Sequence, residues 1–177
     1  MRTTKKITLV SYILPVISPI LLLLFGILVS FYLFFIFMEE NNYLALFIYI
    51  IVLLSLILPS IILEFNYYKV DKNKVLIIDD ITNEVIIVDK ESEFTFRLDE
   101  VDRVRMINSK SYDDTYRTLM PWHPHYYYMI CLKNDDEFMV TRLIVRNLEK
   151  ILNVRIVYKR EAFPFISKNE LKRAKNG

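Results

Sequence analysis

Glycine is almost absent from this chain, with only two glycines among 177 residues. Loops that cradle a phosphate depend on glycine because the backbone must approach the ligand closely, and the sequence contains no such loop. The patterns G-x-S-x-G, H-E-x-x-H and C-x-x-C are missing as well. These absences argue against a nucleotide-dependent enzyme, and we expect a protein without catalytic activity and without a cofactor.

Cysteine is equally scarce. The single cysteine, Cys131, cannot form an internal disulfide, which suits a reducing cytoplasm. It lies in an apolar run with the character of a strand. We therefore predict a buried structural thiol rather than a nucleophile.

Charged residues are missing from two long apolar runs, Ile7–Met38 and Asn41–Leu63, which only Glu39–Glu40 separates. A helix needs about 20 mostly apolar residues to cross a bilayer. The second run meets this requirement over Tyr43–Leu63. The first run is longer, and we place its spanning part near Ile17–Phe37. The sequence therefore predicts a transmembrane hairpin with a very short turn.

Two other interpretations of these runs are weaker. A buried helix of a soluble protein does not explain two adjacent runs of this length and composition. The basic start resembles the first part of a secretory signal, but the apolar stretch is too long and no A-x-A site follows it. We therefore interpret the first run as a retained anchor, with Ile7–Val16 as a tilted or interfacial lead-in.

Basic residues flank the hairpin at its two outer ends. They lie before the first run and after the second, whereas the turn carries only glutamates; the basic positions are Arg2, Lys5, Lys6, Lys69, Lys72 and Lys74. Short basic flanks tend to stay in the cytoplasm. We therefore predict a two-pass protein of the cytoplasmic (inner) membrane, with the N- and C-termini in the cytoplasm.

The predicted spans contain no ionisable residue, which favours an anchor over a transporter because ion pathways use such residues. Gly26 and Ser30 stand four positions apart, a spacing of small residues that lets helices pack closely. The two helices of the hairpin could pack against each other through this pair. A homo-oligomer could use the same pair.

After the hairpin, the sequence changes to short runs with the alternation of β-strands. We predict strands at Val75–Asp79, Glu84–Asp89, Phe94–Leu98, Arg103–Met106, Tyr126–Leu132 and Glu137–Thr141. Their turns must rely on Asn and Asp, which tolerate a left-handed backbone better than other residues. Helical spacing then predicts a helix over Ile144–Leu152 with Thr141 as its N-cap, followed by an extended segment over Val154–Tyr158.

Four short segments carry a resemblance to a known family. They are Tyr68–Val70, Phe94–Leu98, Asp99–Val104 and the helix at Leu148–Leu152. Together they resemble the pleckstrin-homology-like (PH-like) domains that bacteria place behind a transmembrane hairpin. The resemblance implies a bent antiparallel barrel of about seven strands capped by a C-terminal helix, without enzymatic activity. The expected fold is a membrane α-hairpin followed by this mainly-β (α+β) domain.

The chain divides into three predicted parts: a hairpin at residues 1–65, a PH-like domain at 66–153 and a basic extension at 154–177. Basic residues held near a bilayer attract anionic lipid, each with about 1 kcal/mol. The candidate lipid-surface contacts are therefore Lys168, Lys172, Arg173 and Lys175. A solvated tail is the alternative. The sequence contains no recognised nucleic-acid-binding motif.

The segment between Ser109 and His125 departs from the compact family pattern and concentrates aromatic residues. We consider it a candidate interaction loop with the contacts Tyr112, Tyr116, Arg117, Trp122, His123 and His125. Tryptophan and tyrosine suit contacts that are partly apolar and partly wet. The alternatives are a folded loop covering the barrel mouth, a zinc site and a catalytic histidine. We expect neither metal nor catalysis there, because H-x-H alone supplies too few ligands and no positioned partner.

These features predict a non-enzymatic membrane protein whose PH-like domain acts as a protein-interaction or assembly module at the cytoplasmic face. The alternative is a small membrane effector or immunity protein whose hairpin oligomerises or engages a toxin. An enzyme built on the loop histidines is a third hypothesis. The expected partners are the lipid bilayer and either another protein or a second copy of the chain, with no nucleic acid and no identified small-molecule substrate.

Overall fold

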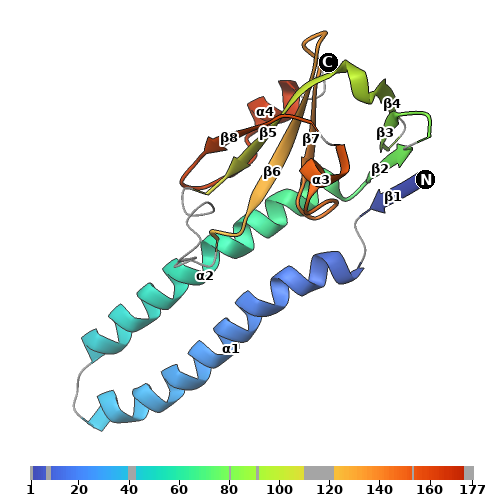
Figure 1. The fold of residues 1–177 in the computed structure, drawn as a ribbon. Coiled ribbons are helices and arrows are strands. Elements are labelled where there is room, and N and C mark those ends of the chain that lie inside the picture. The colour runs from blue at the N-terminus through green and yellow to red at the C-terminus, as the bar shows by residue number, and fades with distance from the viewer. Residues whose placement is uncertain are drawn as a thin grey trace.

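Two long helices and two four-stranded sheets make up the structure, a computed structural model (Figure 1). It describes residues 2–6, 9–39, 43–79, 81–90, 92–109, 122–152 and 154–173. The helices are α1 (Leu9–Glu39), α2 (Tyr43–Asp71), α3 (Leu148–Leu152) and α4 (Lys168–Arg173), with a short 3₁₀ turn at Leu98–Glu100. The strands are β1 (Arg2–Lys6), β2 (Lys74–Asp79), β3 (Glu84–Asp89), β4 (Ser92–Arg97), β5 (Val101–Asn108), β6 (Tyr126–Leu132), β7 (Glu137–Thr141) and β8 (Ile156–Arg160).

The first sheet contains a strand from each side of the helical hairpin. Its order is β1-β2-β3-β4, and all neighbours are antiparallel. Strand β1 precedes the hairpin and pairs with β2 after it, with Thr4 opposite Ile77. The hairpin is therefore an insertion between two paired strands, and the basic N-terminal segment belongs to the sheet.

The second sheet has the order β7-β6-β5-β8, and β8 runs parallel to β5. A parallel neighbour requires a long connection, which β6, β7 and α3 provide. The predicted bent antiparallel barrel of about seven strands is not found: the described strands form two separate sheets, and β8 is parallel to its neighbour. The coarser expectation of an α+β domain is confirmed.

The main core lies between the two sheets and beneath α3. It is formed by the inward-facing residues of β2 to β7 and by residues of α3, including Leu76, Ile78, Val85, Phe96, Val104, Tyr128, Ile130, Val140 and Leu148. The helix predicted from Ile144 begins only at Leu148. The chain first makes a turn in which the Ile144 and Val145 amides donate to the Thr141 carbonyl. This turn still buries both side chains in the core.

A second core covers the opposite face of the second sheet. Leu63 and Tyr67, from the C-terminal part of α2, pack there with Tyr127, Met129 and residues of neighbouring elements. Every residue of β6 is buried because this strand has a core on both faces. Cys131 belongs to this second core, so the prediction of a buried thiol is confirmed.

The strand predictions agree closely with the structure. The bounds of β3, β6 and β7 are those predicted, and the predicted extended segment Val154–Tyr158 overlaps β8, which ends two residues later. Two turns use residues of the expected type, because Asn83 has φ 55° and Asp135 has φ 70°. Short Asn and Asp side chains thus replace glycine in these two turns, whereas the turn between β3 and β4 uses Lys90, with φ 57°.

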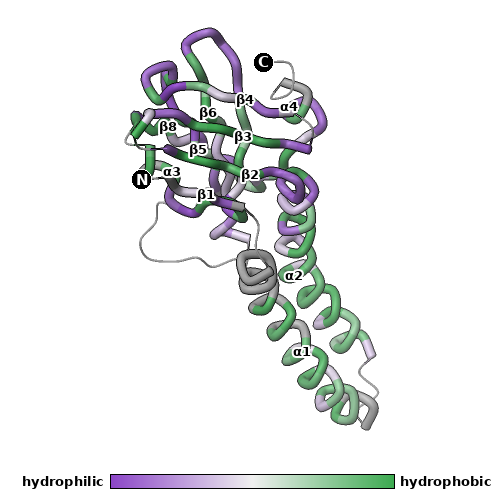
Figure 2. The backbone as a smooth tube through the Cα atoms, turned by 90° about the vertical axis from the view of Figure 1, so that its right-hand side faces the viewer, coloured by the Kyte–Doolittle hydropathy of each residue, from purple (hydrophilic) through white to green (hydrophobic). Residues whose placement is uncertain are grey.

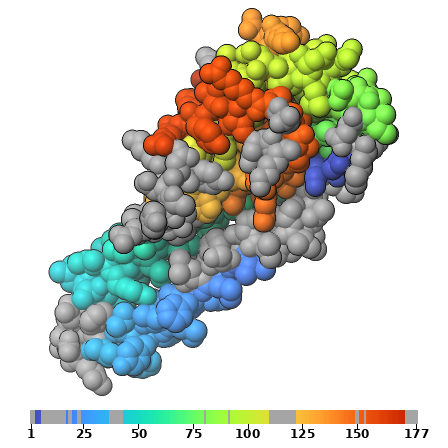
Figure 3. All heavy atoms as spheres, in the orientation of Figure 1, coloured from blue at the N-terminus to red at the C-terminus, as the bar shows by residue number. Residues whose placement is uncertain are grey.

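Helices α1 and α2 run side by side away from the sheets and form an apolar arm (Figures 1, 2 and 3). Many of their large apolar side chains are exposed, among them Leu21, Phe25, Phe31, Phe35, Leu44 and Phe47. In the described residues, α2 is long and apolar enough to cross a membrane, and the apolar stretch Leu24–Ile36 of α1 is shorter than that. A two-span hairpin remains a prediction.

Gly26 lies where the two helices of the arm contact each other. A Cβ atom at this position would come within 2.6 Å of the Leu53 side chain. The Gly26 carbonyl oxygen accepts hydrogen bonds from the hydroxyls of Ser30 at 2.7 Å and Tyr49 at 3.3 Å. The small residue therefore serves contact within one chain.

Replacing Gly26 with leucine should push the two helices apart. We expect Gly26→Leu to destabilise the protein by about 1–3 kcal/mol, because overpacking a tight contact forces neighbours to move. Thermal unfolding of the purified full chain in detergent measures the effect. The second substitution Leu53→Ala should restore part of the lost stability, and Ser30→Ala is a control that leaves the contact intact. A Gly26→Leu protein as stable as the original would contradict this packing.

Candidate functional site

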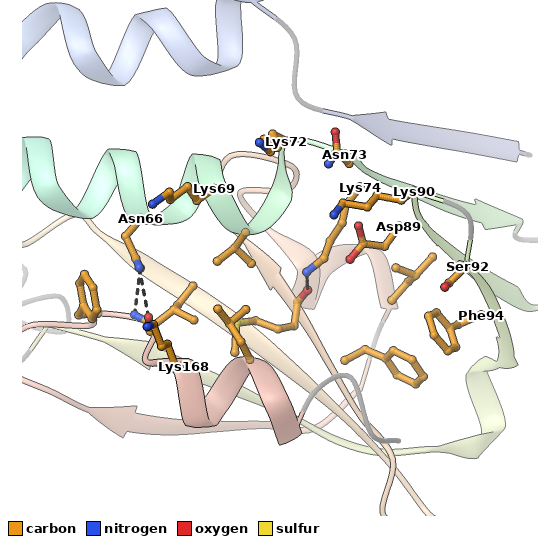
Figure 4. A pocket seen from close by; sticks show the side chains of 17 residues that line it. Asn66, Lys69, Lys72, Asn73, Lys74, Asp89, Lys90, Ser92, Phe94 and Lys168 are labelled. Atoms are coloured by element: carbon orange, nitrogen blue, oxygen red, sulfur yellow. Dashed lines mark hydrogen bonds between the residues drawn. The ribbon is translucent and has the colours of Figure 1, made fainter.

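A pocket of about 810 Å³ lies where α2 enters the domain. Its walls come from the end of α2, from β2, β3, β4 and β7, and from the C-terminal segment that contains α4 (Figure 4). The lining residues are Asn66, Lys69, Val70, Lys72, Asn73, Lys74, Ile87, Asp89, Lys90, Ser92, Phe94, Phe138, Met139, Phe165, Ile166, Lys168 and Leu171. This volume is within the range of small-molecule sites.

The floor of the pocket is apolar. Phe94 and Phe138 contact each other with ring centroids 5.3 Å apart, and Phe138 stacks on Phe96 at 5.2 Å. Ile87 and Met139 are buried beside them. Aromatic pairs of this kind hold a floor in one shape, because they add attraction beyond simple burial.

The rim of the pocket is basic. Five lysines and one aspartate are found among the lining residues. Lys74 is already engaged, since its Nζ donates to the Met139 carbonyl at 2.9 Å and lies 3.4 Å from Asp71 Oδ1. The other four, Lys69, Lys72, Lys90 and Lys168, are exposed, and no described residue forms an ion pair with any of them. We call these four the rim lysines.

Hydrogen bonds hold the C-terminal wall against α2. The Asn66 side chain donates to the Ile166 carbonyl at 3.1 Å and accepts from the Ile166 amide at 3.0 Å (Figure 4). The Tyr67 hydroxyl donates to the Pro164 carbonyl at 2.8 Å. Two residues of α2 therefore fix a segment almost one hundred positions later in the chain.

Helix α4 begins with a capping box. The Ser167 amide donates to Glu170 Oε2 at 2.8 Å, and the Glu170 amide donates to Ser167 Oγ at 3.3 Å. The Tyr127 hydroxyl also donates to Glu170, at 2.9 Å. Burial acts to raise the pKa of Glu170, but the hydrogen bonds from Ser167 and Tyr127 outweigh it and the pKa is lowered. The ionised carboxylate thus fixes the start of α4, the helix in which Lys168 is the first residue.

A buried polar network joins α2 to the second sheet beside this pocket. Glu64, the first acidic residue after the apolar run, is 2% exposed and forms an ion pair with Arg142. Burial, with a further contribution from Arg146, lowers the pKa of Arg142 to about 10, so its guanidinium stays charged at pH 7. A buried carboxylate requires such a partner, because an uncompensated charge in the interior costs several kcal/mol.

His125 completes the network as a neutral residue. Its Nδ1 is 3.1 Å from the Trp122 carbonyl oxygen, and its Nε2 is 3.1 Å from Arg142 Nη2 and 3.0 Å from Glu64 Oε1. Burial lowers the pKa of His125 to about 4, although the Trp122 carbonyl acts in the opposite direction. Nδ1 therefore faces the Trp122 carbonyl oxygen, and Nε2 faces both members of the Glu64–Arg142 ion pair.

The described residues of the predicted interaction loop are partly or fully buried. Trp122 is half-buried and contacts the second core, whereas His123 and His125 are buried. His125 therefore stabilises the interior and is not a surface contact, because its ring nitrogens are engaged within the chain. Tyr112, Tyr116 and Arg117 lie outside the described residues. Among the residues that the structure describes, no cluster of three or more potential metal ligands occurs.

Of the predicted lipid-surface contacts, Lys168 lies on the rim of the pocket. Lys172 and Arg173 belong to α4, and Lys175 lies outside the described residues. Sequence reasoning missed Glu64, Arg142 and the other rim lysines. The position of Glu64 directly after an apolar run was the available signal, but its partner is 78 positions away and no local pattern identifies it.

The two sheets, their shared core and the inserted hairpin define an α+β domain with a basic pocket at the root of an apolar arm. A comparison with protein families matches residues 3–151 to the PH domain family. The chain therefore belongs to this family. PH-like domains are generally non-catalytic, and their presence suggests an interaction module. The match starts within β1, before the hairpin. No curated protein and no solved structure matches the chain.

Acidification should destabilise the protein through His125. An unfolded histidine takes up a proton near pH 6.5, whereas the buried ring resists until about pH 4. The unfolded state therefore binds more protons in this interval, and stability falls as the pH decreases from 6.5 to 4. At about 1.4 kcal/mol for each pH unit, the loss is at most about 3 kcal/mol.

Chemical unfolding of the full chain, followed by the fluorescence of its only tryptophan, Trp122, measures this pH dependence. The control is His125→Asn, whose side-chain amide can still donate to the Trp122 carbonyl but does not titrate. Its stability should change less between these pH values. If the free energy of unfolding changed equally with pH in both proteins, a group other than His125 would be responsible for the loss of stability.

Proposed function

We propose that this protein is a membrane-anchored, non-enzymatic PH domain that acts as a protein-interaction or assembly module at the cytoplasmic face of the membrane. The continuity of α2 carries the proposal. This helix is continuous from Tyr43 to Asp71, with Pro59 inside it, and its first part exposes apolar side chains whereas its last part lies in the core of the domain. A membrane anchor and a domain that share one helix have a fixed mutual orientation.

The junction between arm and domain supports a rigid connection. Leu63 and Tyr67 are fully buried, and Glu64 between them is paired with Arg142. Rotation of α2 would expose these apolar side chains and separate the buried charges, and both changes are unfavourable. A domain held in this way would present the same face to every partner in the plane of the membrane, which lowers the entropic cost of assembly.

The pairing of β1 with β2 supports the predicted topology. Residues 2–6 lie in the same sheet as the chain that follows the hairpin, so both ends of the hairpin meet at the domain. The basic flanks favour the cytoplasm for that side. A two-pass arrangement in the cytoplasmic membrane, with both termini inside, is consistent with these observations.

Strand β8 is a suitable surface for a protein partner. It is the last strand in the order of the second sheet, and its Tyr158 side chain is 53% exposed. Edge strands offer backbone groups to which another strand can be added. Tyrosine is also frequent among the residues that dominate binding energy in protein interfaces.

Membrane anchoring predicts the behaviour of the chain in cell fractionation. We expect the full chain to remain in the membrane fraction after an alkaline wash, and a reporter fused after Gly177 to read as cytoplasmic. Substituting Ile50→Arg and Leu54→Arg in the exposed apolar part of α2 should reduce membrane retention, because each arginine costs about 2.5–3.5 kcal/mol at the centre of a span. A reporter that reads outside the cytoplasm would refute the topology.

A partner at β8 predicts a selective loss of crosslinking. Tyr158→Lys should reduce the yield of crosslinked complexes formed in native membranes by severalfold, because a charge on an edge strand opposes strand addition. Ile81→Lys is the matched control, since Ile81 is 80% exposed in the turn between β2 and β3. Equal yields for the two variants would exclude β8 as the contact.

A further inference from the structure

We infer that the pocket between α2, the first sheet and α4 binds a single-chain amphipathic anion, with a phosphate or carboxylate head at the rim lysines and a short apolar chain on the aromatic floor. This inference goes beyond the proposed function, because it concerns a ligand of the pocket rather than a partner of the domain. It depends only on the described lining of the pocket.

The positive charge of the rim favours a ligand with an anionic head group. The rim lysines come from three separate parts of the chain: Lys69 in the last turn of α2 with Lys72 directly after it, Lys90 in the turn between β3 and β4, and Lys168 at the start of α4 (Figure 4). Asp89 is the one acidic residue among the described lining residues. The rim lysines give the mouth of the pocket a net positive charge, which attracts an anion. Lys69 Nζ also lies 5.1 Å from the centroid of the Phe65 ring.

The apolar floor of the pocket favours a ligand that also carries an apolar chain. Phe94, Phe138 and Phe165 line the pocket together with Ile87 and Leu171. A small hydrophilic anion would neutralise the rim but leave this apolar surface in contact with water. A neutral apolar molecule would cover the floor but leave the lysines without a counter-ion. An amphipathic anion satisfies both, and a pocket of about 810 Å³ accommodates one chain of moderate length.

Two sources could supply such a ligand. The pocket lies at the end of α2 that follows the predicted span, so a single-chain anionic lipid could enter from the membrane surface. A soluble acyl phosphate or fatty acid could equally enter from the cytoplasm. Both present the same chemistry to the pocket, and the source depends on the membrane anchoring whereas the binding site does not.

Calorimetric titration of the purified full chain with octyl phosphate, in neutral non-ionic detergent, tests the site. The pocket variant carries Lys72→Glu, Lys90→Glu and Lys168→Glu. The matched control carries the same number of reversals at exposed positions that do not line the pocket, Arg103→Glu, Lys133→Glu and Arg155→Glu. All six positions are exposed, so both variants should fold, and thermal unfolding verifies this.

We expect the control to bind octyl phosphate like the original chain and the pocket variant to bind at least about tenfold more weakly, since each basic residue contributes about 1 kcal/mol. Equal binding by the two variants would overturn the inference. If octanol bound as tightly as octyl phosphate, a role for the rim lysines would be excluded. If inorganic phosphate bound as tightly as octyl phosphate, a role for the apolar floor would be excluded.

The source is decided in the same assay by adding lysophosphatidylglycerol or lysophosphatidylcholine to the micelles. Competition by the anionic lipid alone supports a ligand from the membrane, and the absence of competition supports a ligand from solution. The titration requires no bilayer and no cell. A protein that failed the topology experiment would therefore still give an interpretable result here.

Discussion

The burial of the last two turns of α2 against the second sheet is the constraint on which the rest of the structure depends. Leu63 and Tyr67 enter the core, and Glu64 is neutralised by Arg142 in a position that water does not reach. Rotating α2 or shifting it along its axis would separate Glu64 from Arg142. The buried carboxylate would then be an uncompensated charge, which is strongly unfavourable. These contacts fix the C-terminal end of α2 on the second sheet.

This constraint also shapes the sheets and the pocket. The second sheet is covered by α2 on one face and by the first sheet on the other, which explains why β6 is buried along its whole length. The C-terminal segment is held on α2 by Asn66 and Tyr67, so α4 closes a wall of the basic pocket. In this member of the PH domain family, an inserted hairpin thus creates a cavity that the paired sheets alone would not form.

Much of the local structure could be predicted because it depends on short sequence patterns of neighbouring residues. The bounds of β3, β6 and β7 follow from apolar alternation and from polar turn residues. Asn83 and Asp135 adopt the left-handed backbone that their short side chains tolerate. Strand β1 escaped prediction because its residues RTTKK contain no apolar position, and its pairing with β2 supplies the reason for its conformation.

The sequence by itself determined where the apolar helices lie, which runs form strands and which motifs of catalysis are missing, because each of these is a property of neighbouring residues. Only the tertiary structure decided that the sheets stay open, that β8 runs parallel to β5, that His125 is buried and that Glu64 meets Arg142. It also brought Lys69, Lys90 and Lys168 to one rim. These contacts join residues far apart in the chain, and their free energy depends on burial and charge that exist only after folding.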